Sequence, residues 1–182
     1  MGKRVFESDL SVDGIRNLKT QLLRYKDEEL NKKCKLLVSN LINKGYEVAK
    51  SSISQSPVGG QVHLTIESKE WQTGTEMLLI ATGSIHEVPG RAPFNVMLAV
   101  EFGSGIYYNP VGSQNPNNDK YGYGPGTYPG QIHAFDEGGW YYWDERSGKW
   151  KHTYGIKATM PMYNASLKIR EEVENEIKKV FS

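Results

Sequence analysis

The sequence predicts an α+β fold with helices at both ends and an antiparallel sheet between them. Apolar residues recur every three or four positions in the first 52 residues and again after Pro161, which is typical of amphipathic helices. Between residues 62 and 66 the period changes to two, which indicates a strand. The 182 residues suit a single domain, 1–182, that buries roughly 70% of the surface exposed by the unfolded chain.

The first helix is expected to be short. Asp13 is a candidate N-cap, because its carboxylate can accept a hydrogen bond from a backbone N–H of the first turn. Ile15, Leu18 and Leu22 then lie on one stripe. Three carboxylates at positions 27–29 indicate a second helix start, since negative charge favours the positive end of a helix dipole.

The second helix is expected to be long and amphipathic and to end near Ser52. Its apolar stripe has spacings of three, four and seven, and core packing is preferred over a groove for a partner. The stripe consists of Leu30, Cys34, Leu37, Leu41 and Val48. The one cysteine of the chain lies in this stripe, so we expect a buried apolar role and no internal disulfide.

Three strands are expected in the middle of the chain. The segment 62–66 alternates apolar and polar residues, and the segment 77–81 is continuously apolar. The segment 96–102 is also largely apolar and is followed by Gly103 and Gly105, so it is interpreted as a third strand. Short connections between these segments favour antiparallel neighbours in one sheet.

Residues 103–139 form a long insert of unusual composition. They hold nine of the 19 glycines, four of the eight prolines and five of the 11 tyrosines. A loop of this length within a compact domain is uncommon unless it is functional or disordered. Because tyrosine offers a large contact area at low entropic cost, we expect the insert to order against a neighbouring molecule, with an unpartnered loop as the alternative.

The insert is followed by an aromatic hairpin and then by a last helix. Trp-Tyr-Tyr-Trp at 140–143, a turn at 144–148 and a second strand at 150–153 predict a hairpin with aromatic residues on both faces. Pro161 is suited to the first position of the helix, where its missing N–H costs nothing. The helix should turn one stripe inward, made of Ile169, Val173, Ile177 and Val180, and should expose Glu172 and Glu176 on its opposite side.

No catalytic, cofactor or metal site is expected. The four histidines are not spaced as metal ligands, and no second cysteine is present. The glycine-rich stretch 122–126 lacks the Lys-Ser or Lys-Thr of a phosphate-binding loop, and Pro125 removes a backbone N–H. We therefore expect a protein that is not an enzyme.

The charge and hydropathy of the chain limit the classes of partner that it is expected to bind. The formal net charge is +1, so no strong field would draw the chain onto nucleic acid or an anionic membrane. No stretch approaches the roughly 20 apolar residues that cross a bilayer, and the N-terminus does not resemble a signal peptide. We expect a protein made in a reducing cytoplasm, with no membrane and no sequence-specific nucleic-acid partner.

The aromatic hairpin supports an alternative function. The segment 139–148 resembles one unit of the choline-binding repeats of cell-wall proteins, in which aromatic side chains cage a quaternary ammonium. Repeat modules need about three stacked copies to bury a core, and this chain has one. The alternative is therefore a single-copy aromatic module that binds choline or a glycan of the cell wall.

Two short motifs carry a resemblance to a known family. Val-Glu-Phe-Gly-Ser at 100–104 and Thr-Tyr-Gly-Ile-Lys-Ala-Thr-Met-Pro-Met at 153–162 resemble a phage tail-component family, described as gene-product-ten-like. The family pattern has threonine where this chain has Ser104. Its later Ala-Arg-Pro-Phe corresponds here to residues 159–162, so the arginine and the phenylalanine are missing. The aromatic segment before the second motif resembles the versions found in phages and prophages of Gram-positive bacteria.

The resemblance implies a structural virion protein of the neck, active in tail completion or head–tail joining and assembled in the host bacterial cytoplasm. It implies a homo-oligomeric ring, taken as six-fold, that contacts other neck and tail proteins such as a head-closure connector, a tail terminator or the tail tube. Glu101 and Phe102 would anchor the strand end, with Glu101 either paired with a basic neighbour or exposed. The candidate interface residues are Glu101, Phe102, Gly103, Tyr107, Tyr108, Tyr121, Tyr123, Trp140, Tyr142, Trp143, Pro161 and Met162.

Overall fold

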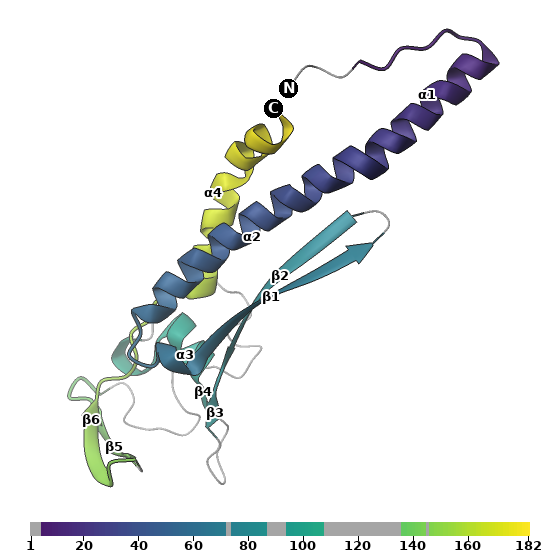
Figure 1. The fold of residues 1–182 in the computed structure, drawn as a ribbon. Helices are drawn as coiled ribbons and strands as arrows, with labels where there is room; N and C mark the ends of the chain where they lie inside the picture. The colour runs from purple at the N-terminus through teal and green to yellow at the C-terminus, as the bar shows by residue number, and fades with distance from the viewer. Residues whose placement is uncertain (1–4, 72–73, 87–93, 108–135, 145) are drawn as a thin grey trace.

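A computed structural model describes residues 5–71, 74–86, 94–107, 136–144 and 146–182. The fold is α+β, as predicted, with a long N-terminal helical rod, small antiparallel sheets and a C-terminal helix. Figure 1 shows the rod at the centre, with α4 along one side and the hairpin of β1 and β2 along the other. Among the described residues, no helix has the length and apolar character needed to span a bilayer.

The N-terminal rod is one continuous helix, which corrects the predicted second start at residues 27–29. It consists of α1 (Val12–Tyr25), a π-helical turn (Lys26–Leu30) and α2 (Asn31–Ser54). The carboxylates cap nothing, because the residues on both sides of the π-helical turn keep right-handed helical geometry. The N-cap of α1 is Ser11 rather than Asp13: its hydroxyl accepts from the Gly14 N–H at 3.0 Å.

The predicted strands at 62–66 and 77–81 are present within a long hairpin. Strand β1 (Val62–Trp71) pairs with β2 (Gly74–Gly83) in antiparallel register, with Ile66 opposite Leu79. The single central sheet of the prediction is replaced, within the described chain, by three two-stranded sheets. The other two are β3 (Ile85–His86) with β4 (Phe94–Asn95), and β5 (Trp140–Asp144) with β6 (Lys149–Thr153).

The predicted third strand at 96–102 is wrong: this segment is the helix α3 (Val96–Phe102). The side chain of Asn95 caps it by accepting from the Met97 N–H at 2.9 Å. Six of its seven residues are buried, which matches its almost entirely apolar sequence. A short helix that is buried on all sides cannot be distinguished from a buried strand by periodicity.

The main core lies where α2, the base of the β1–β2 hairpin and α3 meet. It is built from Ile53, Val62, Val96, Met97 and Val100. The helix α4 (Pro161–Phe181) begins at Pro161 as predicted and packs along α2. The two helices approach each other closely at Gly45, since a Cβ on this residue would lie 2.6 Å from the Ile169 Cδ1 atom.

The predicted inward side of α4 is confirmed in part, since Val180 is buried and Ile169 lies against Gly45. It is wrong for two residues of the helix. Glu176 is only 3% exposed and faces α2, whereas Ile177 is 41% exposed. The α2 residues opposite this side are polar: Lys44 Nζ lies 2.6 Å from Glu172 Oε2 and 3.1 Å from Glu176 Oε1. Asn40 also donates to Glu176 at 2.9 Å. The acidic side of α4 is therefore part of a helix–helix contact rather than a free surface.

Candidate functional site

The two motifs singled out in the sequence meet at the start of α4. The Ser104 N–H donates to the Ile156 carbonyl at 2.8 Å, and the Ile156 N–H donates to the Ser104 hydroxyl at 2.9 Å. The Ile106 N–H donates to the Tyr154 carbonyl at 3.3 Å, and the Thr159 N–H donates to the Val100 carbonyl at 2.9 Å. The motifs therefore form one clasp, made largely of backbone groups, that links α3 to the irregular segment 154–160 that leads into α4.

Glu101 holds the N-terminus of α4. Its two carboxylate oxygens accept from the Met162 N–H at 2.9 Å and from the Tyr163 N–H at 3.0 Å. The residue is 8% exposed, and burial raises the pKa of its carboxyl although these two N–H donors lower it. Neither predicted environment of Glu101 applies: it is not an exposed carboxylate, and among the described residues no basic side chain pairs with it.

The other predicted residues of this region also lie inside the clasp. Phe102 is packed, as predicted, but at the end of a helix rather than of a strand. Gly103 has a positive φ of 78°, and Pro161 is fully buried at the first position of α4. Met162 is half-buried against the main core. Within the single chain, these residues set the shape of the clasp and offer little surface of their own.

The hairpin of β5 and β6 carries an exposed aromatic surface, which we call the aromatic face: Tyr141, Trp143, Trp150, His152 and Tyr154. Cross-strand register puts Tyr141 opposite His152 and Trp143 opposite Trp150. The two tryptophan rings meet edge to face at 5.7 Å, and the His152 ring lies 4.8 Å from each tyrosine ring. Tyr141 is 67% exposed and Trp150 is 66% exposed.

The predicted aromatic residues are divided between the two faces of this hairpin. Trp143 belongs to the aromatic face, whereas Trp140 and Tyr142 lie on the opposite side. Trp140 is half-buried and covers Gly105, where an added Cβ would lie 2.5 Å from the ring. Tyr142 is exposed, beside an ion pair between Lys151 and Asp144 that lowers the pKa of Asp144 to about 2.

The remaining members of the aromatic face were not named as site residues from the sequence. Trp150 and Tyr154 follow the hairpin turn, and pairing the two strands in register was the signal that could have found them. Of the tyrosines predicted in the insert, Tyr107 is 41% exposed. Tyr108, Tyr121 and Tyr123 lie outside the described residues.

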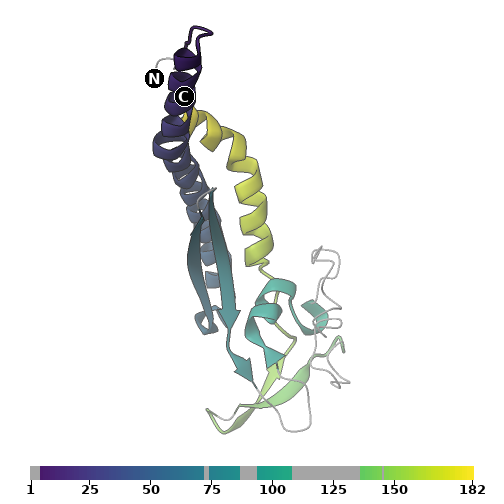
Figure 2. The ribbon, with the colours of Figure 1, turned by 90° about the vertical axis from the view of Figure 1, so that its right-hand side faces the viewer.

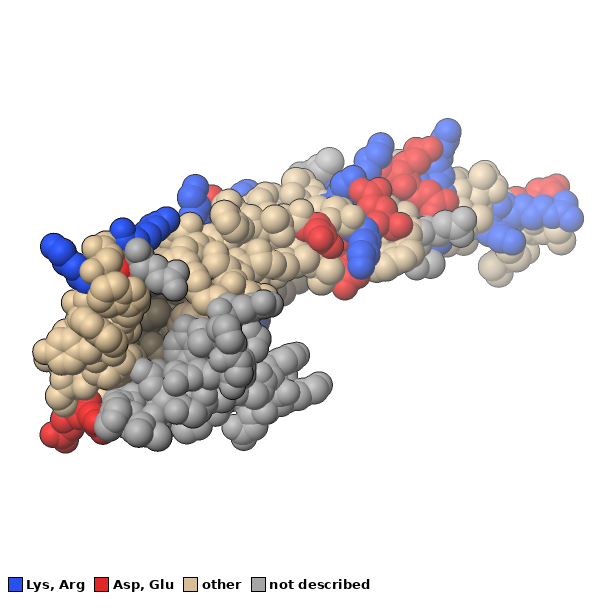
Figure 3. All heavy atoms as spheres, turned by 90° about the horizontal axis from the view of Figure 1, so that it is seen from below, with Lys and Arg blue, Asp and Glu red and all other residues tan. Residues whose placement is uncertain are grey.

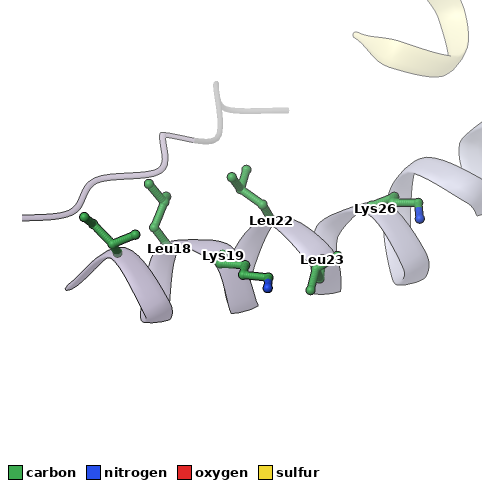
Figure 4. Close-up of a pocket in the computed structure, with 6 residues that line it drawn as sticks. Leu18, Lys19, Leu22, Leu23 and Lys26 are labelled. Atoms are coloured by element: carbon green, nitrogen blue, oxygen red, sulfur yellow. The ribbon is translucent and has the colours of Figure 1, made fainter. Parts of the chain in front are cut away.

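A second exposed apolar surface lies on α1, which buries none of its residues. A shallow groove on this helix, here called the α1 groove, is lined by Ile15, Leu18, Lys19, Leu22, Leu23 and Lys26. Figure 4 shows Leu18 and Leu22 projecting to the same side of the helix, with both lysines along the same stretch. The stripe predicted at Ile15, Leu18 and Leu22 is present, but it packs into no core.

The described residues contain no group of three or more histidine, cysteine, aspartate or glutamate side chains that could hold a metal ion. Comparisons with protein-family models, curated proteins and solved structures find no match to this chain.

Proposed function

We propose that this chain is a structural protein of the phage head–tail neck, active in tail completion or head–tail joining, which works by assembling into a closed ring. The observation that carries the proposal is the balance of apolar surface. Among the described residues, 20 large hydrophobic side chains are at least 36% exposed, whereas 11 hydrophobic residues form the buried core. The exposed side chains that gather into one surface, as on the aromatic face and on α1, favour a subunit that is completed by contact with other proteins.

The position of the surfaces also supports assembly. Figures 1 and 2 show an elongated molecule with α1 at one end and the β5–β6 hairpin at the other. The α1 groove and the aromatic face are therefore far apart, so one copy can contact two neighbours at once. A heterologous contact whose repeated rotation closes builds a ring, and a ring suits a neck through which DNA passes.

The family resemblance supports the neck of the virion as the place where this protein assembles. Its two motifs, at 100–104 and 153–162, form the clasp that fixes the β5–β6 hairpin relative to α4. In the proposed ring the helical rod forms the body, and the aromatic face meets a head-closure connector, a tail terminator or the tail tube. Tyrosine and tryptophan are favoured at such contacts because they bury large areas at low entropic cost.

The test is deletion of the gene from the phage or prophage that encodes it. We expect DNA-filled heads and finished tails that remain unattached, and rescue of joining by the wild-type gene supplied on a plasmid. A rescue plasmid with Tyr141→Ser and Trp150→Ser should give soluble protein but poor joining, because both side chains are exposed. Infectious virions from the deletion strain would contradict the proposal.

One observation favours the alternative, a module that binds choline or a wall glycan: the aromatic face is open to solvent. A cation cage needs ring faces that surround the ammonium group. Here the edge of one tryptophan is already directed at the other, and His152 lies between two tyrosines. We expect no retention of the wild type on a choline matrix. Retention that free choline releases, and that Trp143→Ala removes, would favour the module instead.

A further inference from the structure

The α1 groove combines apolar and positively charged side chains. Ile15, Leu22 and Leu23 are 53%, 45% and 47% exposed, and Lys19 and Lys26 line the same groove. Lys19 makes no ion pair with a described residue, and Lys26 reaches only its neighbour Asp27 at 3.8 Å. Arg16 and Arg24 on the same helix pair with Asp13 and Glu28, so Lys19 and Lys26 are the charges that the groove itself presents. An apolar surface with acidic side chains would complement it.

The β1–β2 hairpin has such a surface on the side that faces away from α2. Glu70 pairs with Lys35 of α2, and Leu64 and Ala81 pack against the core, so that set of alternating residues faces inward. The opposite set, here called the outer hairpin face, consists of Thr65, Glu67, Lys69, Trp71, Glu76, Leu78 and Ile80.

The outer hairpin face is apolar along β2 and acidic toward the hairpin tip. Leu78 and Ile80 are half-buried, Trp71 is 57% exposed, and the two glutamates, Glu67 and Glu76, are exposed. On this face Glu67 and Glu76 outnumber Lys69, which lies opposite Glu76, so its net charge is −1. Figure 3 shows acidic and basic side chains intermingled toward the end that carries α1, with further charges of both signs at the opposite end.

We propose that the α1 groove of one copy docks on the outer hairpin face of the next copy, and that this head-to-tail contact builds the ring. The inference rests on the proposed function, to which it adds the interface. Apolar side chains of the groove would cover Leu78, Ile80 and Trp71. Lys19 and Lys26 would lie against Glu67 and Glu76.

The charges favour this pairing over two copies of α1 against each other. In a symmetric α1 pair, Lys19 and Lys26 of both copies would be brought together, and like charges at a contact are unfavourable. The head-to-tail pairing instead joins two surfaces of opposite charge on different elements. Because these surfaces differ, the contact is heterologous and can be repeated around a closed ring.

The test uses two charge-reversal variants of the full chain, with particle mass measured by light scattering across a concentration series. The groove variant carries Lys19→Glu and Lys26→Glu, and the hairpin variant carries Glu67→Lys and Glu76→Lys. All four side chains are exposed, so circular dichroism should show unchanged folding. Each variant alone should need at least about tenfold more protein to assemble, because every contact then opposes like charges.

Mixing the two variants should restore assembly at the wild-type concentration, because each groove then meets a hairpin of opposite charge, and copies alternate around the ring. A symmetric α1 contact would instead leave the hairpin variant assembling like the wild type, because that variant does not change the groove. A chain with all four reversals should also assemble.

Three results would overturn the inference. Wild-type assembly by both single variants would leave ring formation intact but place its interface elsewhere. Binding of the wild type to anionic vesicles, lost in the groove variant while assembly is kept, would assign the groove to lipid. A wild type that stays monomeric at every concentration would contradict the proposed ring itself, and the interface with it.

Discussion

At the residue scale, the clasp between the two motifs depends on a few positions that tolerate no other side chain. Gly155 has a φ of 106°, and a Cβ placed on it would lie 2.0 Å from the Ser104 carbonyl oxygen. That oxygen belongs to the backbone and cannot rotate away. Glu101 contributes from the other side by accepting from two N–H groups at the start of α4. The clasp therefore couples the C-terminus of α3 to the origin of α4.

We predict that Gly155→Ala destabilises the fold by at least about 2 kcal/mol, because a strained φ adds to a clash with backbone. The matched control is Gly148→Ala in the turn of the aromatic hairpin. Gly148 also has a positive φ, 59°, but an added Cβ would have no atom within 4 Å, so about 1 kcal/mol is expected. Denaturant unfolding measures both, and equal costs would show that the contact with Ser104 contributes nothing.

At this scale the sequence pointed to the two motifs, but not to the hydrogen bonds that their residues make. The motifs at 100–104 and 153–162 were singled out, and the two segments do meet. The hydrogen-bond donors of Glu101 could not be predicted. From the local sequence alone, a carboxylate at this position could equally be exposed to solvent or be buried as the cap of another helix. What decides its role is the position of α4, which begins 60 residues later. Long-range contacts of this kind leave no periodic signal.

At the element scale, periodicity predicted the long helix and the strands of the β1–β2 hairpin, whereas a turn signal predicted the aromatic hairpin and Pro161 predicted the start of α4. Periodicity also has limits. It failed at 96–102, where burial on all sides removes the alternation that separates helix from strand. It succeeded in part for the inward side of α4: Ile169 and Val180 lie inward as predicted, but Ile177 is exposed and Glu176 is buried. Glu176 lies on the inward side because Asn40 and Lys44 on α2 bind its carboxylate.

The contact between α2 and α4 should depend on pH. Hydrogen bonds to Lys168 and Lys44 lower the pKa of Glu172 to about 2, and those to Lys44 and Asn40 lower the pKa of Glu176. Both values lie below the ordinary value of 4.5. The stability that these groups contribute is therefore fully present above about pH 4.5 and is lost as the pH falls toward 2.

We predict that Lys44→Met lowers stability at pH 7 and that the difference from wild type shrinks as the pH falls from about 4.5 to 2. Protonation then removes from the wild type the same attraction that the variant lacks. Lys50→Met, at an exposed position of the same helix, is the control and should change little. Thermal unfolding at each pH measures the difference. A Lys44→Met difference that stays constant over this range would show that the carboxylates do not contribute through Lys44.

At the scale of the whole molecule, the chain is an elongated body whose ends carry exposed apolar surfaces (Figures 1 and 2). From the sequence, an assembly protein was an expectation that rested on the tyrosine-rich insert and the two short motifs. The sequence did not reveal that α1 would extend beyond the core with its apolar stripe uncovered, since an amphipathic stripe is the same whether it faces a core or another subunit.

The measurement that tests ring assembly most directly is electron microscopy of the purified full-length chain at a concentration where light scattering shows assembly. We predict end-on class averages of closed rings with a central channel and one dominant symmetry, six-fold. The groove variant, Lys19→Glu with Lys26→Glu, should show no rings at that concentration and should regain them when mixed with the hairpin variant. Wild-type particles that are only monomers, or open filaments without closure, would contradict the account.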